Sequence, residues 1–498
     1  MAAPMDLELL TSSDAETTLI AGSLVDIGCC PRCVLRYLGE KRPWVYKANQ
    51  EDLRKLVCKL CEEDDQSTYG SSGTTPCPVC LGILEDFCCT DFLQKIKQCV
   101  DKNGYEFVNY QCSLSLPVSN ILREHALTLH LGNKFDYAYH GLDDEAIPSV
   151  KDVWKWFSGP ELSRILGSSF QLKSQFDISV NFTHDDAERE CNFLLDVQPH
   201  IFRRRKVKKF DFETFTRTNV AKAVREISDG KFQECYTCPP ARPANKCRYQ
   251  LGCSHESVFI AGRYNKYSRH LSQTPWIVDG GRKSETSVQE LLCEIILDKF
   301  KPTDHKLSSS GREDVDVRML GTGRPFVVEL INPHVVKFSA EDLKTIQQDT
   351  NSLTKDVAIS DLQIVPREDT ANLKEGEIEK SKTYSALCWS ETELQQEQLD
   401  KLKELTDLKL DQKTPLRVLH RRPLASRLRV IHNMHAEKVN KHHFRLYLST
   451  QAGTYIKEFV HGDFGRTTPN LSILLGVECD ILELDVEAVN VEWPPRLS

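Results

Sequence analysis

The chain has 498 residues, of which 40% are hydrophobic and 27% are charged, and its formal net charge is −8. A chain of this length can bury two or three ordinary cores, and its negative charge excludes a uniformly basic coat, so any surface for RNA has to be local. No apolar run reaches the roughly 18 residues of a membrane helix, and residues 1–16 lack the regions of a signal peptide. The sequence predicts an intracellular protein without membrane contact.

Nineteen cysteines are the first chemical signal along the chain. Their number is odd, the chain is long and several lie in C-x-x-C pairs, which favours reduced thiols and metal over disulfides. Two such pairs make a tetrahedral zinc site. Three pairs lie near the start of the chain: Cys30/Cys33, Cys58/Cys61 and Cys77/Cys80.

The first and third of these pairs have proline directly after the first cysteine, which suits a tight turn around thiolate ligands. The second pair, Cys58 and Cys61, lies in residues 52–61, whose apolar spacing predicts a buried helix face instead. We therefore assign one zinc ion to Cys30, Cys33, Cys77 and Cys80. Because this set has no histidine, carboxylate or open position, the predicted role of the metal is structural. Residues 34–76 then form an insertion between the two pairs.

A second group of cysteines lies near a proline-rich stretch, residues 239–243, that has the composition of an interdomain linker. Its spacing also fits zinc, but cysteines of a loop in a reducing compartment often bind nothing, so a second zinc site is the less favoured alternative. The cysteines concerned are Cys235, Cys238, Cys247 and Cys253.

The hydrophobic periodicity of residues 91–257 alternates between that of helices and that of strands. One predicted helix begins at residue 91, and two others cover 150–166 and 219–227. The predicted strands cover 105–116 and 176–182. Gly159 and Pro160 are expected to interrupt the second helix. Periodicity alone predicts a mixed α+β domain here.

The densest basic run of the chain lies in this region, between Phe202 and Phe210. Its six cations would neutralise several phosphates and make binding steeply dependent on salt. A solvated loop or a nuclear import signal would have the same composition. The candidate RNA-binding residues are Arg203, Arg204, Arg205, Lys206, Lys208 and Lys209.

After residue 257 the predicted strands and helices are longer and more regular. The predicted elements are a strand over 258–262, a helix over 287–299, a hairpin of strands 315–320 and 326–331, a helix over 340–349 and a strand over 479–493. Directly after the first strand, a compact basic and aromatic patch suits a folded RNA: Arg263, Tyr264, Lys266 and Arg269.

Residues 417–429 hold five arginines and a histidine in an alternating stretch. Contact with phosphates through Arg421 and Arg422 and an edge strand with a charged face fit this pattern equally well.

A Ser-Gly loop over 308–311 leads into a segment in which Asp314, Asp316 and Arg318 share one face of a predicted strand. Such a strand packs its apolar face on a core and presents a carboxylate close to arginines. That environment can hold a nucleophilic aspartate ionised and aimed. A half-exposed strand with solvated ion pairs is the common alternative.

The segment 311–314, G-R-E-D, resembles the G-R-x-D signature of pseudouridine synthases. Three further segments match in the expected chain order: 382–387, 453–460 and 469–476. Together with residues 262–269 and the paired cysteines, they make the chain similar to the archaeal and eukaryotic Pus-ten family of tRNA pseudouridine synthases. The resemblance spans essentially the whole chain and is most specific in its second half.

The resemblance implies an α+β fold in which a zinc-knuckle region and a THUMP-like accessory region precede a mixed-sheet pseudouridine synthase domain. The expected boundaries are 1–90 for the zinc-binding region, 91–257 for the THUMP-like domain with a linker at 235–257, and 258–498 for the catalytic domain. The resemblance also implies the same four zinc ligands. It favours RNA contact for the basic run between Phe202 and Phe210.

For the active site, the resemblance places the catalytic aspartate at Asp314, with Asp316 as the rival two residues later. Lys457 is expected to pair with Asp314 and keep it ionised. Tyr384 is expected to stack on the target uracil, with its hydroxyl available for proton transfer. Whether the aspartate attacks the sugar, attacks the base or removes a proton stays open.

Arg312 is expected to help open the target nucleotide out of the RNA stack, because an enzyme that acts on a base has to reach it outside the helix. Leu471 is expected to close the pocket, with Leu474 or Leu475 as alternatives. The implied reaction converts uridine to pseudouridine and needs no organic cofactor.

The implied substrate is the T arm of tRNA, at uridines 54 and 55 in tRNA numbering, and other structured RNA is a further candidate. The protein is expected to be a monomer in the nucleus, the cytoplasm or both. The alternative is a zinc-stabilised RNA-binding scaffold without catalysis. The chain has neither loop of the methyltransferases and thiouridine synthases that also carry THUMP-like regions.

Overall fold

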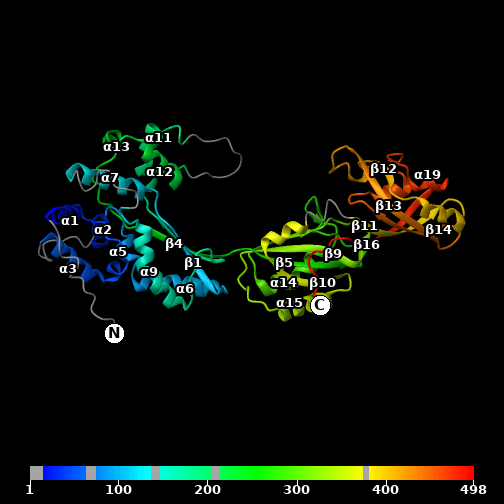
Figure 1. Ribbon diagram of the computed structural model, residues 1–498, viewed down its shortest axis with the longest axis horizontal. Helices are drawn as coiled ribbons and strands as arrows, with labels where there is room; N and C mark the ends of the chain where they lie inside the picture. Colours follow the sequence, from blue (N-terminus) through cyan, green and yellow to red (C-terminus); the bar gives the residue numbers. More distant parts are fainter. Residues whose placement is uncertain (1–14, 63–74, 136–145, 203–213, 374–380, 498) are drawn as a thin grey trace. The chain divides into compact units, whose positions relative to one another are not determined.

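The computed structural model describes residues 15–62, 75–135, 146–202, 214–373 and 381–497. The chain divides into two compact units, residues 1–254 and 255–498 (Figure 1). In the described part of the chain, no helix has both the length and the apolar character needed to cross a bilayer.

The first unit combines many helices with a small sheet. Its helices are α1 (Ala15–Ile27), α2 (Pro31–Tyr37), η2 (Val45–Lys47), α3 (Gln50–Cys61), α5 (Ile83–Asp86), α6 (Thr90–Asn103), α7 (Ser119–Lys134), α9 (Val150–Leu166), α10 (Ala187–Cys191), α11 (Phe193–Val197), α12 (Arg217–Glu226) and α13 (Asp229–Cys235). Its strands are β1 (Asn109–Ser115), β2 (Ser169–Phe170), β3 (Phe176–Thr183) and β4 (Arg248–His255). They follow the order β2-β1-β3-β4, and β1 is parallel to both of its neighbours.

The helix α3 confirms the prediction for the second cysteine pair. The Asn49 side chain accepts a hydrogen bond from the backbone amide of Asp52 and so caps the helix start. Cys58 and Cys61 are buried with the apolar side chains of the same helix. Both cysteines therefore belong to the core of this unit.

Two other predictions for this region were wrong. α9 is continuous through Pro160, and it buries Trp154 and Leu162 in the core. Burial of these side chains offsets the one backbone hydrogen bond that a proline cannot donate. Residues 248–255, expected in a linker, form β4 of the sheet.

The second unit is built on a large, mostly antiparallel sheet. Its strands are β5 (Val258–Lys266), β8 (Asp304–Ser309), β9 (Val317–Ile331), β10 (Val357–Val365), β11 (Lys382–Ser390), β12 (Leu408–Lys413), β13 (Ser426–Lys438), β14 (His443–Thr450), β15 (Thr467–Thr468) and β16 (Cys479–Val489), and a separate hairpin has β6 (Ile277–Val278) and β7 (Gly281–Arg282). The order in the sheet is β10-β5-β9-β16-β11-β14-β13-β12-β15, with β8 paired to β9.

Helices cover this sheet in two places and create two cores. The helices of the unit are α14 (Val288–Phe300), α15 (Ala340–Leu353), η3 (Arg367–Thr370), α17 (Gln396–Asp400), η4 (Lys401–Glu404), η5 (Leu416–Val418), α18 (Ile456–His461) and α19 (Leu471–Leu475). One core packs α14 and α15 on β5, β9 and β10, which lie together in Figure 1. The other core packs α17, α18 and α19 against the strands from β11 to β16.

The centre of the sheet joins these two halves. β16 runs parallel to β9, so that Leu484 lies opposite Val317, and antiparallel to β11, so that Val486 lies opposite Tyr384. These four side chains therefore stand next to one another although they come from three distant segments.

The hairpin predicted over 315–331 was wrong, because β9 is one strand. Between Met319 and Arg324 it bulges away from β5, and Gly321 and Gly323 take positive φ values of 56° and 75°. A Cβ atom at Gly321 would stand 2.0 Å from the Glu487 carbonyl oxygen, so only glycine fits. The turn-like composition predicts a reversal of the chain, whereas the neighbouring strands make it a bulge.

Candidate active site and metal centre

Asp314 lies in the loop between β8 and β9 and not on the predicted strand, which begins only at Val317. Its backbone carbonyl accepts a hydrogen bond from the Val317 amide, so a turn directs the aspartate away from the sheet edge. Gly311 starts this loop with φ of +90°, and a Cβ atom there would approach Lys382 Nζ to 2.9 Å. The positive φ therefore favours glycine at the first position of the G-R-E-D segment.

A buried network of hydrogen bonds anchors the loop to the core. Glu313 is fully buried and accepts a hydrogen bond from Arg324 Nε at 2.9 Å. It also accepts from the hydroxyl of Tyr264 at 2.9 Å, and Gln273 donates to the same hydroxyl at 2.8 Å. Burial and the Glu313 charge raise the pKa of Tyr264, so the hydroxyl stays a donor. The residue before Asp314 is thus fixed in the core.

A buried lysine holds the backbone of the loop itself. Lys266 Nζ donates to the carbonyl oxygens of Asp314 at 3.0 Å, Val315 at 2.8 Å and Leu271 at 2.8 Å. Its side chain is inaccessible to solvent, and this burial lowers its pKa to about 8. A protonated Lys266 has three donors for these three acceptors.

We expect the rate of any reaction that depends on Asp314 to fall as the pH rises through about 8, because neutral Lys266 has only two donors and the Asp314 loop loosens. The folded protein releases this proton at a lower pH than the unfolded chain does. The titration of Lys266 therefore makes the free energy of unfolding rise with pH above about 8 and does not itself destabilise the fold there. Rates and melting temperatures across this pH range check it. A Lys266→Met variant that keeps the same alkaline limb would contradict the assignment.

Two cations approach the Asp314 carboxylate. Arg417 Nη1 lies 2.8 Å from Asp314 Oδ2, whereas Lys457 Nζ lies 3.7 Å from the same oxygen. Lys457 is closer to Asp316, at 2.6 Å. Burial alone would raise the pKa of Asp316, but the hydrogen bond and charge of Lys457 outweigh it and hold that pKa below its ordinary value. Sequence reasoning expected the Lys457 contact and missed Arg417 as a partner.

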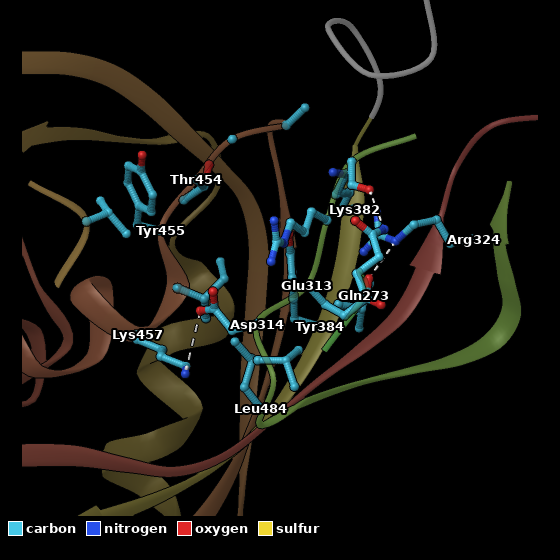
Figure 2. Close-up of a pocket in the computed structure, with 18 of the residues that line it drawn as sticks. Gln273, Glu313, Asp314, Arg324, Lys382, Tyr384, Thr454, Tyr455, Lys457 and Leu484 are labelled. Carbon is cyan, nitrogen blue, oxygen red and sulfur yellow. Dashed lines mark hydrogen bonds and ion pairs between the residues drawn. The ribbon is translucent and has the colours of Figure 1, made fainter. Parts of the chain in front are cut away.

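A cavity of about 890 Å³ opens above these groups. Its floor is formed by the four neighbouring side chains at the centre of the sheet, Val317, Leu484, Val486 and Tyr384. Figure 2 shows Asp314 and Lys457 on one side of it and Lys382, Gln273 and Arg324 on the other. Tyr384 is almost buried, which raises its pKa to about 12 and keeps its hydroxyl protonated at neutral pH.

Most of the charged residues that line the cavity are cations. The basic lining residues are Arg312, Arg324, Lys382, Arg417, Arg421, Arg422, Arg429 and Lys457, and the lining carboxylates are Glu313 and Asp314. Arg312, Arg421 and Arg422 are exposed. A chain with a negative net charge thus has a local basic surface around the carboxylate that sequence analysis selected.

The predicted pocket leucine does not line the cavity. Leu471 is fully buried at the start of α19, in the core of this half of the sheet. Leu474 and Leu475 also pack against that core and are not among the lining residues. Leu484 of β16 supplies a leucine in the cavity instead. The alternating sequence of residues 479–493 predicts a strand, but it does not indicate that this strand lies at the centre of the sheet.

Three of the four residues of the predicted basic and aromatic patch belong to β5 itself and do not form an exposed RNA surface. Arg263, Tyr264 and Lys266 are buried. Arg263 donates to five backbone carbonyls, two of them in the β9 bulge at Thr322 and Gly323. These cations satisfy backbone acceptors inside the protein and are not available to phosphates.

Arg269 is tied to the protein as well. Its guanidinium lies 2.8 Å from Asp485 and 3.1 Å from Glu483, and it donates to the backbone carbonyls of Asp316 and Leu484. The other predicted RNA-binding run, Arg203 to Lys209, lies outside the described residues.

Four cysteines of the first unit form a candidate metal centre. The Sγ atoms of Cys30, Cys33, Cys77 and Cys80 all lie within 4.8 Å of one another, and the four residues are buried. Cys30 and Cys80 are 3.8 Å apart at sulfur, which matches the roughly 3.8 Å edge of a tetrahedron with zinc to sulfur bonds of about 2.3 Å. The donor set and its spacing fit a four-coordinate metal.

Local structure explains how the two pairs meet. Cys30 precedes α2, and Pro31 begins that helix and brings Cys33 back over Cys30. After Cys77, positive φ values at Leu81 and Gly82 close a tight turn, with the Leu81 amide donating to the Cys77 carbonyl. Arg36 Nη1 lies 3.5 Å from the Cys33 sulfur. A positive charge thus stands beside ligands that are negative when a metal is bound.

The second cysteine group does not assemble in the described residues. Cys235 is exposed, Cys238 and Cys253 are partly exposed and Cys247 is buried, and these thiols form no cluster with metal-ligand spacing.

The comparisons with known proteins agree with the geometry. The family described as "Pus10, C-terminal" matches residues 259–490, and "Eukaryotic Pus10, N-terminal" matches residues 77–253. The tRNA pseudouridine synthase Pus10 of Homo sapiens is 44% identical over 97% of this chain and 99% of its own length. A putative tRNA pseudouridine synthase Pus10 of Drosophila melanogaster is 33% identical over 95% of this chain and 96% of its own.

An archaeal relative matches only part of the chain. The tRNA pseudouridine synthase Pus10 of Thermofilum pendens is 38% identical over 47% of this chain and 52% of its own length. Among solved structures, a Cbf5-Nop10-Gar1 complex aligns over 45% of this chain and 47% of its own at 16% identity. Its TM-score of 0.25 is too low to support a structural argument.

Proposed function

Because the chain belongs to the Pus10 family, named for tRNA pseudouridine synthases, we propose that it isomerises uridine to pseudouridine in the T arm of tRNA, at position 54, position 55 or both. The observation that carries this proposal is the position of Asp314. Its carboxylate contacts Arg417, and both residues line a basic cavity together with Tyr384 of β11. The carboxylate comes from the one segment that matches the family signature.

The reaction breaks the bond between the ribose C1′ and the uracil N1 and forms a bond between C1′ and C5. The C5 proton is lost and N1 gains one, so the product is an isomer and no redox partner is consumed. Asp314 is the group for attack or proton transfer, and Arg417 and Lys457 are the cations beside its carboxylate. The detached base has to stay in the cavity to be reattached.

The other lining residues have roles that fit this sequence of steps. Tyr384 offers a ring for stacking and a protonated hydroxyl at the cavity floor. Exposed Arg312, Arg421 and Arg422 offer charges for the phosphates of a nucleotide that has turned out of its stack. Leu484 takes the place expected of Leu471.

We further propose that the four clustered cysteines hold one zinc ion that stabilises the first unit. Four thiolates satisfy zinc and leave no coordination position for substrate. The metal thus contributes to folding and takes no part in the isomerisation.

The T-arm assignment is tested with unmodified tRNA transcripts, the purified full chain and no added cofactor. Site-resolved mapping of pseudouridine is expected to show product at position 54, position 55 or both. Transcripts with cytidine at one of these positions separate the two sites. Product at other uridines would overturn the T-arm assignment. Tight tRNA binding without any product would favour an RNA-binding scaffold.

A further inference from the structure

Arg417 joins two carboxylates that lie on different elements. It belongs to η5, and its Nη1 lies 2.8 Å from Asp314 Oδ2 in the cavity. Its Nε donates to Oε1 of Glu458 on α18 at 2.7 Å. One planar group therefore spans from the catalytic loop to the helix behind it.

Glu458 needs this arginine. Its side chain is only 2% exposed, and a buried carboxylate is costly unless a cation and hydrogen bonds compensate it. Among the described residues, its other oxygen, Oε2, has no hydrogen-bond partner. Burial alone would lower the pKa of Arg417, but the hydrogen bond and charge of Glu458 and the charge of Asp314 outweigh it and raise that pKa. The buried Glu458 carboxylate therefore holds one edge of Arg417, whose side chain is 37% exposed and lines the cavity.

Lys457 cannot replace Arg417 at the aspartate in this arrangement. Its ammonium contacts both oxygens of Asp316, at 2.8 and 2.6 Å, and stays 3.7 Å from Asp314. The flexible, compact charge of a lysine also sets no direction, whereas a guanidinium has donors on two edges in one plane. Of the two cations, only Arg417 sets the orientation of the Asp314 carboxylate.

We propose that Arg417 is a positioning residue for Asp314, and that Glu458 acts through Arg417 by holding it in place. This inference rests on the proposed function, in which Asp314 is the catalytic aspartate. It differs from the phosphate contact expected for residues 417–429, because a positioning residue changes the rate of the bound complex and a phosphate contact changes the affinity.

The test uses the full chain with a tRNA transcript and measures the single-turnover rate at saturating tRNA and, separately, the dissociation constant of tRNA. Arg417→Gln is expected to lower the rate by about 10²-fold, with affinity changed by less than about threefold. Arg417→Lys keeps the charge but cannot bridge two carboxylates, so it is expected to stay slow. Arg164→Gln is the matched control, since Arg164 pairs with Glu161 at 2.6 Å on the surface of the first unit.

One further variant separates positioning from misfolding. Arg417→Gln leaves Glu458 buried without its cation, whereas the double variant Arg417→Gln/Glu458→Gln has no unpaired charge and nearly the original shape. We expect the double variant to melt close to wild type, to stay as slow as Arg417→Gln and not to be slower. Recovery of the rate in the double variant would mean that the single variant was merely misfolded, and would overturn the proposal.

The remaining outcomes are equally decisive. An unchanged rate with weaker tRNA binding would make Arg417 a phosphate contact. A double variant slower than Arg417→Gln would mean that Glu458 does not act through Arg417. Absence of product from the wild type would overturn the proposed function itself, and product from the wild type with an unaffected Arg417→Gln would overturn the positioning role alone.

Discussion

Asp314→Asn is expected to lower pseudouridine formation by about 10³-fold or more while tRNA binding is retained. The change removes the negative charge but keeps the shape of the side chain. It leaves the buried Glu313, Arg324 and Lys266 contacts that hold the loop. The measurement is the single-turnover rate on a tRNA transcript beside the tRNA dissociation constant.

Asp316→Asn is the matched control, because Asp316 lies two residues later in the same turn and is more exposed than Asp314. Its loss releases Lys457 from its strongest ion pair. We expect a reduction of less than about tenfold, since Arg417 still contacts Asp314. A full loss with Asp316→Asn and an active Asp314→Asn would mean that the catalytic aspartate is Asp316.

Cys80→Ser is expected to abolish zinc binding and to lower the free energy of unfolding of the first unit by about 4 kcal/mol or more. Cys80 is one of the four buried thiols of the cluster, so the change removes one of the four ligands that a tetrahedral zinc ion needs. Metal analysis of the purified chain and urea unfolding with and without a chelator check this result.

Cys58→Ser provides the comparison, because Cys58 is an equally buried cysteine of a C-x-x-C pair that lies in a helix face. Its replacement costs the burial of one hydroxyl and is expected to leave the zinc content at one ion per chain. A wild-type protein without zinc, or equal behaviour of the two variants, would contradict the structural metal.

The sequence is enough to predict the residue types of the site, but it does not indicate which of the basic side chains are exposed. Asp314, Tyr384 and Lys457 were selected from motifs that lie far apart in the chain, and the sheet brings all three to one cavity. Arg263 and Lys266 have the composition of an RNA surface. They are buried because the β9 bulge and the Asp314 loop present backbone carbonyls that need donors. No local pattern reveals such acceptors.

Partners across the sheet were equally hidden. Arg417 was noticed as one cation of an arginine-rich stretch, while its two carboxylates lie 103 and 41 residues away in the sequence. The Gly321 to Pro325 segment has the composition of a hairpin turn, and only the neighbouring Glu487 carbonyl shows why glycine is needed in a bulge. Such contacts depend on tertiary packing, which overrides local preference.

The position of β16 has a consequence for how the protein is made. This strand follows all the other described strands in the sequence, yet it lies between β9 and β11 and supplies Leu484 and Val486 to the cavity floor. During synthesis, β9 and β11 leave the ribosome long before their common neighbour exists. The nascent chain therefore exposes two unpaired strand edges and has no isomerase site until residues 479–489 have emerged. A chain that ends before β16 is expected to lack part of the cavity floor, to be inactive and to aggregate through its unpaired strand edges.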